Sequence, residues 1–268
     1  MWGHAAPILC YHHIADDLST RTSEFTVTAA ALSTQIRVLR RLGFRSYTLR
    51  ELTQAYEQEL PVRDAIVLTF DDGYRDTYAT AAPILEAHGF KGTVFAVTGY
   101  VGRRMQRGGA PTFASWDELR ALRDRGWEIG LHTATHADLG TARAGTLRHE
   151  VLAAARVLEL ELSEPVWSVA YPWGKYSPAA IDAVIECGAR AAVTVSRSLA
   201  TPASPRYALP RYAVRGGDTL LDFILAVATG YGPKSVVRFV RAQGTRLARG
   251  APVASSDPVR EGCEWWQA

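Results

Sequence analysis

Short apolar runs and longer amphipathic stretches alternate along this chain of 268 residues. Apolar, β-branched runs of about four to eight residues predict buried strands. Such runs occur at 6–11, 65–70, 92–97, 127–131, 166–171 and 190–195. Apolar positions three and four residues apart predict helices over 28–42, 49–58, 77–88, 116–125, 144–162 and 178–187. Alternation of this kind is typical of an α/β protein with a mostly parallel sheet, either open or closed into a barrel.

Signals at the helix ends agree with these boundaries. Glycine follows four of the predicted helices, where a left-handed C-cap is usual: Gly43, Gly89, Gly126 and Gly188. Ser115 and Glu118 have the spacing of a capping box. The chain has no internal repeat and no linker, so we expect one domain over 1–230, followed by a C-terminal helix and tail over 231–268. The glycine-rich stretch 99–113 follows a strand and is the kind of loop that often covers a site.

Composition and charge narrow the function classes. Hydrophobic residues make up 47% of the chain and the net charge is only +3, with arginines spread along the sequence, so we expect no nucleic-acid partner. Cys10, Cys187 and Cys263 lie far apart and predict neither a disulfide framework nor a cysteine-rich zinc site. No apolar run reaches the ~18 residues of a membrane span, and the start lacks a signal peptide. We therefore expect no membrane span and a cytoplasmic protein, extracellular only if a leader was removed.

Two polar motifs each follow a predicted strand. Asp71 and Asp72 come directly after the strand at 65–70, although Asp-Gly is also ordinary turn chemistry. His132 and His136 follow the strand at 127–131, and their spacing places both on one face of a helical turn. Parallel strands end at the same edge of a sheet, which is where α/β proteins build their sites.

These residue types predict a catalytic metal centre. Two histidines and one carboxylate supply three ligands and leave a position open for water. The second carboxylate is then free to accept a proton from that water. Zinc is the first choice, and nickel, cobalt and iron suit the same ligands. Glycoside hydrolysis is the alternative use of two carboxylates, but it does not require the histidines.

A third motif, Tyr171-Pro172-Trp173-Gly174, also ends a predicted strand. A tight turn here could direct backbone N–H groups at an oxyanion, and Trp173 and Tyr176 offer flat faces on which sugar rings stack. The alternative is a plain β-turn with an aromatic side chain in the core. The candidate substrate-binding residues are Tyr74, Tyr171, Pro172, Trp173 and Tyr176.

Together, the stretches TFDDG, HTATH and AYPWG resemble the polysaccharide deacetylases, the NodB-homology group also called carbohydrate esterase family 4, over about residues 6–215. The resemblance implies a distorted (β/α)7 barrel and metal-dependent removal of an N-acetyl group, usually from N-acetylglucosamine units. It implies that Asp71 is the general base and that the Trp173 N–H belongs to the oxyanion site. The implied metal ligands are Asp72, His132 and His136.

The chain departs from the family pattern at two positions. Ala170 stands where the third motif usually has an arginine that orients the base, and Leu209-Pro210-Arg211 stands where a late leucine-x-histidine usually supplies the general acid. The stretches LCYHHI and LPRY resemble the branch that contains the poly-N-acetylglucosamine deacetylases, and that resemblance selects His12 as the general acid. Arg211 follows the strand-like stretch RYALP, and we expect its planar guanidinium to orient Asp71.

The preferred function is a metal-dependent deacetylase acting on an N-acetylated amino sugar, as a polysaccharide, an oligosaccharide or a sugar conjugate. The first alternative is a catalytically silent carbohydrate-binding protein, because the usual arginine and late histidine are missing. The second is a deacylase of a small natural-product precursor or of a lipid- or nucleotide-linked sugar. The sequence specifies neither the acyl group nor the oligomeric state.

Overall fold

The computed structural model describes residues 4–16, 24–104 and 112–231. Within these residues, seven parallel strands form the path of one curled sheet, in the order β10-β1-β5-β6-β7-β8-β9. Their bounds are β1 (Ile8–Tyr11), β5 (Ala65–Phe70), β6 (Thr93–Ala96), β7 (Glu128–Leu131), β8 (Ser168–Ala170), β9 (Ala191–Val193) and β10 (Tyr212–Ala213). Leu209, just ahead of β10, bridges to Val193 of β9, so the two ends of the sheet meet. This confirms the distorted α/β barrel that the sequence predicted.

Three short strands lie beside this path. β4 (Arg45–Tyr47) pairs with the first half of β5. β2 (His13–Ile14) and β3 (Thr26–Val27) form a separate two-stranded sheet that continues from the end of β1. After Tyr11 the chain leaves the barrel sheet, and from His13 it pairs with β3. The position of His12 is therefore restricted by the strands on either side of it.

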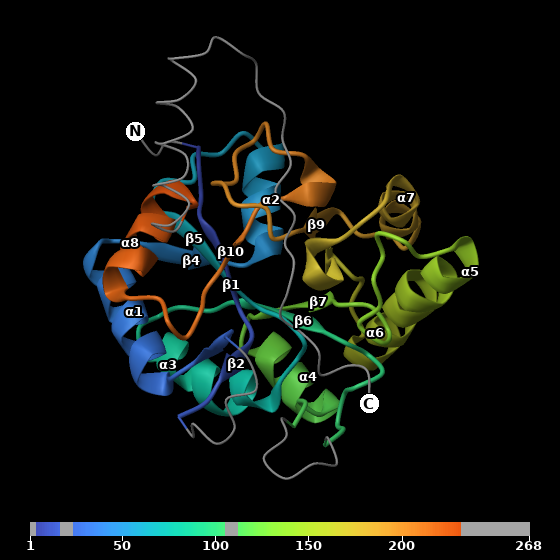
Figure 1. The fold of residues 1–268 in the computed structure, drawn as a ribbon, viewed down its shortest axis with the longest axis horizontal. Coiled ribbons are helices and arrows are strands. Elements are labelled where there is room, and N and C mark those ends of the chain that lie inside the picture. The colour runs from blue at the N-terminus through green and yellow to red at the C-terminus, as the bar shows by residue number, and fades with distance from the viewer. Residues whose placement is uncertain (1–3, 17–23, 105–111, 232–268) are drawn as a thin grey trace.

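The helices lie around the sheet (Figure 1). They are α1 (Ala29–Arg41), α2 (Leu49–Glu57), α3 (Ala82–Glu86), α4 (Trp116–Asp124), α5 (Ala144–Leu147), α6 (Ala154–Leu162), α7 (Pro178–Glu186) and α8 (Leu220–Thr229). A π-helical turn over Thr77–Ala81 precedes α3, and another over Arg148–Ala153 joins α5 to α6. The predicted helices at 77–88 and 144–162 are therefore each one continuous helical stretch with a wider turn inside.

Most of the predicted elements are confirmed within two residues of their expected ends. All four glycines named as C-caps have positive φ, from 73° to 88°, and Ser115 and Glu118 form the capping box of α4. The predicted strand over RYALP is wrong, because Arg206–Ala208 form a 3₁₀ turn and the strand begins at Tyr212. Pro205 and Pro210 have no N–H to donate to a ladder, which explains why a strand does not form between them. The sequence analysis also missed α8 and the short strands β2, β3, β4 and β10.

Alternation along the strands separates two apolar regions. Leu9, Ile66 and Leu68 belong to the larger core, which packs the outside of the sheet against the surrounding helices. Ile8 and Val67 belong to a smaller core that contains the alternate strand residues together with Leu49 and Leu52 of α2. The inside of the barrel is thus filled by one residue in two from each strand, with α2 packed against it.

A buried polar cluster ties α2 to the barrel at the amino ends of the strands. The carboxylate of Glu128 accepts hydrogen bonds from Ser168 Oγ at 2.5 Å, the backbone N–H of Arg50 at 2.7 Å and Thr93 Oγ1 at 3.2 Å. Glu128 is 7% exposed. A carboxylate near a helix N-terminus satisfies N–H groups that have no partner within the helix. Glu128 therefore fixes the first turn of α2 to the strands.

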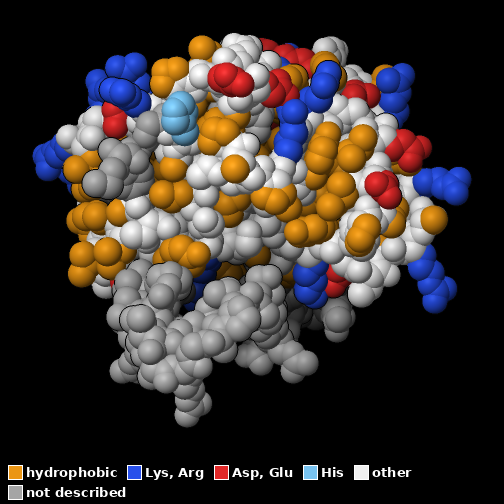
Figure 2. Space-filling model, turned by 90° about the horizontal axis from the view of Figure 1, so that it is seen from above, with side chains coloured by type: hydrophobic (Ala, Val, Ile, Leu, Met, Phe, Trp, Pro, Cys, Tyr) orange, Lys and Arg blue, Asp and Glu red, His pale blue; other side chains and the backbone are white. Residues whose placement is uncertain are grey.

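Charged side chains do not gather into a stripe on the face shown in Figure 2, where lysines and arginines are scattered among apolar and acidic ones. No helix among the described residues is long and apolar enough to cross a membrane. The predicted C-terminal helix and tail lie outside the described residues, as do positions 105–111 of the glycine-rich loop.

We predict that Glu128→Ala lowers the free energy of unfolding by on the order of 3 kcal/mol, because three buried donors lose their acceptor together. Glu128→Gln, which keeps one accepting oxygen, should cost less. Glu161→Ala, which removes an exposed ion pair with Arg120, should cost under about 1 kcal/mol. Urea unfolding measures all three, and a loss under about 0.5 kcal/mol for Glu128→Ala would contradict the role of the cluster.

Candidate active site

Strand alternation directs the first residues of each motif into the barrel. The inward side of β5 carries Val67 and Thr69, and Asp71 continues that series just past the strand end. His132 follows Gly130 in the same way at the end of β7, and His12 follows Cys10 at the end of β1. The pattern that fills the barrel with apolar residues therefore also brings an acid and two histidines to its carboxyl end.

Asp72 reaches the same place through an unusual backbone turn. Its φ is 71°, and that of Gly73 is 76°. A Cβ atom at Gly73 would lie 3.2 Å from the Cα of Ala96, so a side chain there would press on the end of β6 as well as strain the backbone. The glycine therefore allows two adjacent acids to lie at the same end of the barrel.

The histidine pair lies in a loop after β7, so the expected helical turn is wrong. Thr133 and His136 have left-handed φ values of 67° and 61°, which a helix excludes. The loop still brings the two imidazole rings together, with 4.9 Å between their centroids. Nδ1 of His132 lies 2.8 Å from the carbonyl oxygen of Ala170. A hydrogen bond donated there leaves Nε2 with its lone pair directed at Asp72.

The distances among these groups fit a metal ion. His132 Nε2 lies 3.5 Å from Asp72 Oδ1, and His136 Nε2 lies 3.3 Å from the same oxygen. Bonds of 2.0–2.1 Å at tetrahedral angles place two zinc ligands about 3.3 Å apart. In the part of the chain that the structure describes, Asp72 Oδ1 is buried and has no hydrogen-bond donor. A cation between the three side chains would give this oxygen its partner.

Burial sets the protonation of the two histidines. It lowers the pKa of His132 to about 4 and that of His136 to about 4, since a charged imidazole loses its hydration there. Both rings are therefore neutral at neutral pH and have a lone pair to offer. The three side chains form a buried cluster able to hold a divalent ion.

Arg211 lies inside the barrel against Asp71. Its Nη1 donates to Asp71 Oδ1 at 2.7 Å and its Nη2 to Oδ2 at 2.8 Å. Two further donors are also used, since Nε donates to the carbonyl oxygen of Thr194 and Nη1 also donates to Thr69 Oγ1. Arg211 is 0% exposed and Asp71 is 3% exposed. The sequence analysis expected this contact, and the catalytic role of the pair remains a prediction.

The arginine determines the charge of Asp71. Burial by itself would raise the pKa of this carboxyl, but the Arg211 charge and its two hydrogen bonds hold that pKa well below the usual range. Asp71 is therefore a carboxylate at neutral pH, fixed in orientation and able to accept a proton. A general base must be ionised and correctly positioned, and Asp71 meets these two requirements.

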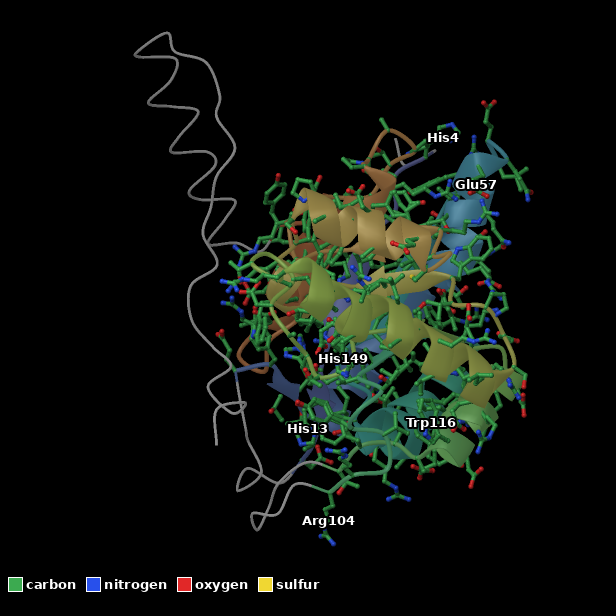
Figure 3. The ribbon with its side chains drawn as sticks, turned by 90° about the vertical axis from the view of Figure 1, so that its right-hand side faces the viewer. His4, His13, Glu57, Arg104, Trp116 and His149 are labelled. Carbon is green, nitrogen blue, oxygen red and sulfur yellow. The ribbon has the colours of Figure 1, made fainter. Side chains whose placement is uncertain are left out.

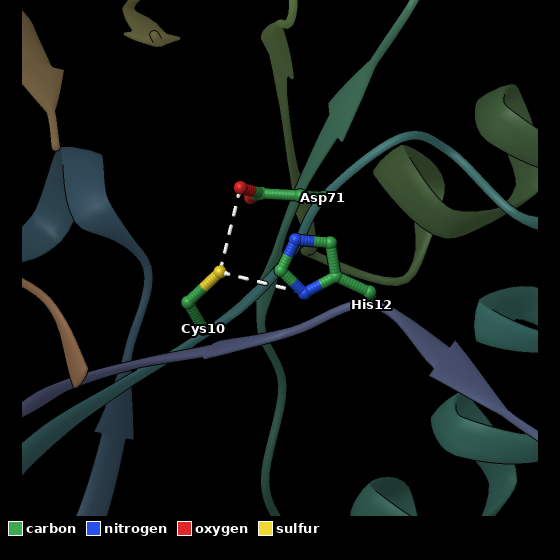
Figure 4. A group of neighbouring side chains, drawn as sticks. All are labelled: Cys10, His12 and Asp71. Atoms are coloured by element: carbon green, nitrogen blue, oxygen red, sulfur yellow. Dashed lines mark hydrogen bonds between the residues drawn. The ribbon is translucent and has the colours of Figure 1, made fainter. Parts of the chain in front are cut away.

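His12 lies beside Asp71, with Cys10 next to both (Figure 4). The Cys10 thiol donates to Asp71 Oδ2 at 3.4 Å and lies 4.0 Å from His12 Nδ1. These three side chains could also approach one cation, but both Asp71 oxygens already bind the positively charged Arg211. We therefore place the metal at Asp72 and the histidine pair.

The other histidines lie elsewhere. His13 pairs with Asp76, which leaves His12 as the member of the pair that faces the acids. His4 lies at the opposite end of the molecule from His13 and Arg104 (Figure 3). His149 is on the surface, with 66% of its side chain exposed.

The five expected substrate-binding residues differ in how far they are exposed and in what they contact. Trp173 lies against the metal site, 4.4 Å from the His136 ring between centroids, and has a left-handed φ of 54°. Tyr176 is 39% exposed and stacks on Tyr171 at 4.8 Å. Tyr171 is 0% exposed and Pro172 is also buried, and the assignment of both as substrate-binding residues remains a prediction. Tyr74 is half-buried and stacks on Phe113.

The sequence analysis missed two residues of this site. Cys10 could have been found, because it precedes His12 by two positions and therefore shares its side of the strand. Glu150, which binds the histidine loop, lies on another element, and no spacing in the sequence links the two.

Comparison with known proteins agrees with this geometry. The sequence profile of the polysaccharide deacetylase family matches residues 60–192, and the chain belongs to this family. YxkH of Bacillus subtilis (strain 168), assigned as a polysaccharide deacetylase, is 25% identical over 212 residues, covering 79% of this chain and 72% of its own. The poly-beta-1,6-N-acetyl-D-glucosamine N-deacetylase of Staphylococcus aureus (strain MSSA476) is 22% identical over 225 residues, covering 81% and 76%.

A solved structure shows the same fold. The Streptococcus pyogenes deacetylase PplD in complex with acetate superposes with a TM-score of 0.75 at 23% identity, covering 84% of this chain and 98% of its own. At this level of identity, the match supports the fold and leaves the substrate of this chain to be inferred.

We predict that Arg211→Met lowers the free energy of unfolding by about 3–5 kcal/mol, because Asp71 would remain buried without its counter-charge. The double variant Asp71→Asn with Arg211→Met should recover part of that loss, because no charge then remains unpaired. Urea unfolding of the parent protein, the two single variants and the double variant gives the coupling energy between the two side chains. A coupling under about 1 kcal/mol would contradict the importance of the pair.

Proposed function

We propose that this protein is a metal-dependent N-deacetylase of an acetylated amino sugar of the N-acetylglucosamine type. The observation that carries the proposal is the convergence of three features at one end of the barrel. The Asp71 carboxylate, which is bound by Arg211, lies beside the Asp72, His132 and His136 cluster, which is suited to a divalent ion. The third feature is His12, which lies next to both. Amide hydrolysis requires a base, a Lewis acid and a proton donor, and these groups supply one candidate for each.

Each residue has a definite task in this proposal. Asp72, His132 and His136 hold the ion, which when bound lowers the pKa of water and polarises the acyl oxygen. Asp71 accepts the proton of the attacking water, with Arg211 keeping the carboxylate in place. His12 donates a proton to the departing amine, since an amine is a poor leaving group unless it is protonated.

The contacts of Arg211 argue against a catalytically silent protein. Two departures motivated that alternative: Ala170 stands where the family usually has the arginine that orients the base, and the late histidine is missing, for which His12 is the proposed replacement. Arg211 makes that contact from the segment that leads into β10. Ala170 instead offers its carbonyl oxygen to His132. In this proposal Arg211, just ahead of β10, takes the place of the usual orienting arginine, so the base still has a partner.

The rim of the site suits a sugar ring. Trp173 presents aromatic surface next to His136, and Tyr176, three residues further along, is 39% exposed. Aromatic faces are common platforms for sugars. The S. aureus relative is a poly-beta-1,6-N-acetyl-D-glucosamine N-deacetylase, which supports the same substrate class. The length of the substrate is left to the assay.

The direct test is acetate release from N-acetylglucosamine oligomers by protein depleted of metal and then supplied with zinc, nickel or cobalt. We expect release only after a metal is added, and no release from Asp72→Ala. Sugar binding without acetate release under every metal would refute the deacetylase proposal. Faster release from a nucleotide-linked N-acetylglucosamine than from oligomers would move the substrate to a small precursor.

We predict that His12→Ala lowers kcat by about 10²–10⁴-fold with unchanged metal content, because the leaving amine loses its proton donor. The matched control is His13→Ala, which removes an imidazole bound to Asp76 and should cost less activity. Steady-state kinetics and metal analysis of both variants decide the assignment. A larger loss of kcat in His13→Ala than in His12→Ala would transfer the role to His13.

A further inference from the structure

We propose that Glu150 is a positioning residue that holds the loop carrying His132 and His136 in the shape required to bind a metal. The proposal rests on the metal site assigned above. It concerns a residue of the π-helical turn Arg148–Ala153, which belongs to none of the three motifs that carry the chemistry.

The carboxylate of Glu150 takes up the N–H groups of the loop. Its Oε2 accepts from the backbone N–H of Thr135 at 2.8 Å and from that of Ala134 at 3.1 Å. Its Oε1 accepts from Thr135 Oγ1 at 2.8 Å. Glu150 is 4% exposed. These bonds fall on the residues between the two histidines, so they fix the backbone that connects the ligands.

The carbonyl groups of the same loop bind the segment after β6. The N–H of Thr98 donates to the carbonyl of Thr133 at 3.1 Å, and the N–H of Gly99 donates to that of Ala134 at 2.8 Å. The hydroxyl of Tyr100 donates to the carbonyl of Thr135 at 2.9 Å. The loop is therefore held from both sides, with donors from one segment and a carboxylate acceptor from Glu150.

The shape of the loop explains why it needs this support. Residues 132–136 lie in neither a helix nor a strand, so no regular ladder satisfies their backbone groups. Thr133 and His136 both have positive φ, which side-chain-bearing residues adopt only when their surroundings impose it. Without the Glu150 carboxylate, the N–H and the hydroxyl of Thr135 would lose their acceptor, and the N–H of Ala134 would keep only the backbone carbonyl of Glu150 at 3.1 Å. The loop would then be less firmly held in the shape that directs both imidazoles at Asp72.

The hydrogen-bond donors around Glu150 favour the charged form of its carboxyl. Burial would raise the pKa of its carboxyl, but hydrogen bonds from Thr135 and His149 reverse that effect and lower it below the usual value. Nδ1 of His149 lies 3.1 Å from Oε1. A charged acceptor binds N–H groups more strongly than a neutral one, so glutamine at this position would hold the loop less firmly.

The experiment compares Glu150→Ala and Glu150→Gln with Glu51→Ala. Glu51 is a matched control, because its carboxylate also accepts from a backbone N–H, that of Thr48 at 2.8 Å, and it lies at the amino ends of the strands, away from the metal site. Each metal-free protein is titrated with Zn²⁺ against a chromophoric chelator. The visible spectrum of the Co²⁺ form reports the coordination geometry, and urea unfolding reports stability.

We expect Glu150→Ala to bind Zn²⁺ about 10–100-fold more weakly and to alter the Co²⁺ spectrum, as is usual when a residue behind the ligands is lost. Glu150→Gln should lie between this variant and the parent protein. Glu51→Ala should lose stability but keep the affinity and the spectrum.

Two outcomes would overturn the proposal. One is Glu150→Ala with Zn²⁺ affinity within twofold of the parent protein. The other is an equal loss of affinity in Glu51→Ala, which would mean that any destabilisation weakens the site. Neither depends on the substrate: a parent protein that binds Zn²⁺ but releases no acetate would refute the deacetylase function and leave the role of Glu150 standing.

Discussion

The ion pair between Asp71 and Arg211 is the interaction on which the rest of this structure depends. Both side chains are buried inside the barrel, where either charge alone would be costly. Arg211 can reach Asp71 only because the chain returns to the sheet between β9 and β1, where the Arg211 N–H also donates to the carbonyl of Ser196 at 3.0 Å. The segment that closes the barrel therefore also orients the proposed base.

Two adjacent carboxylates acquire different properties from this arrangement. Asp71 follows the inward side of β5 and meets a fixed positive charge, so it remains ionised. Asp72 is turned away by a left-handed backbone conformation and faces two neutral imidazoles. Burial raises the pKa of Asp72, and its interactions with the neighbouring histidines only partly offset that effect. A bound cation would supply the positive counter-charge that Asp72 lacks. In the proposed function, proton transfer and metal binding then fall to two adjacent residues.

The fold and the acid and histidine motifs could be predicted because both depend on local rules. Strand alternation gives the inward series that ends at Asp71, and glycine caps mark the ends of helices such as α1 at Gly43. The shape of the histidine loop could not be predicted, since its left-handed residues follow from contacts with Thr98 and Glu150 rather than from their own preferences. The contact of Arg211 with Asp71 was predicted from chemistry, because a general base needs an orienting partner. The strand expected just before Arg211 was placed wrongly.

The most direct test of this account is anomalous diffraction from crystals of the protein grown with cobalt. The account predicts one strong peak, bonded to a carboxylate oxygen of Asp72 and to Nε2 of both His132 and His136. Asp71 should stay outside the coordination sphere and remain bound to Arg211. A peak bonded to Asp71 with Arg211 displaced, or no peak at the three ligands, would contradict the central claim that the two adjacent acids have separate tasks.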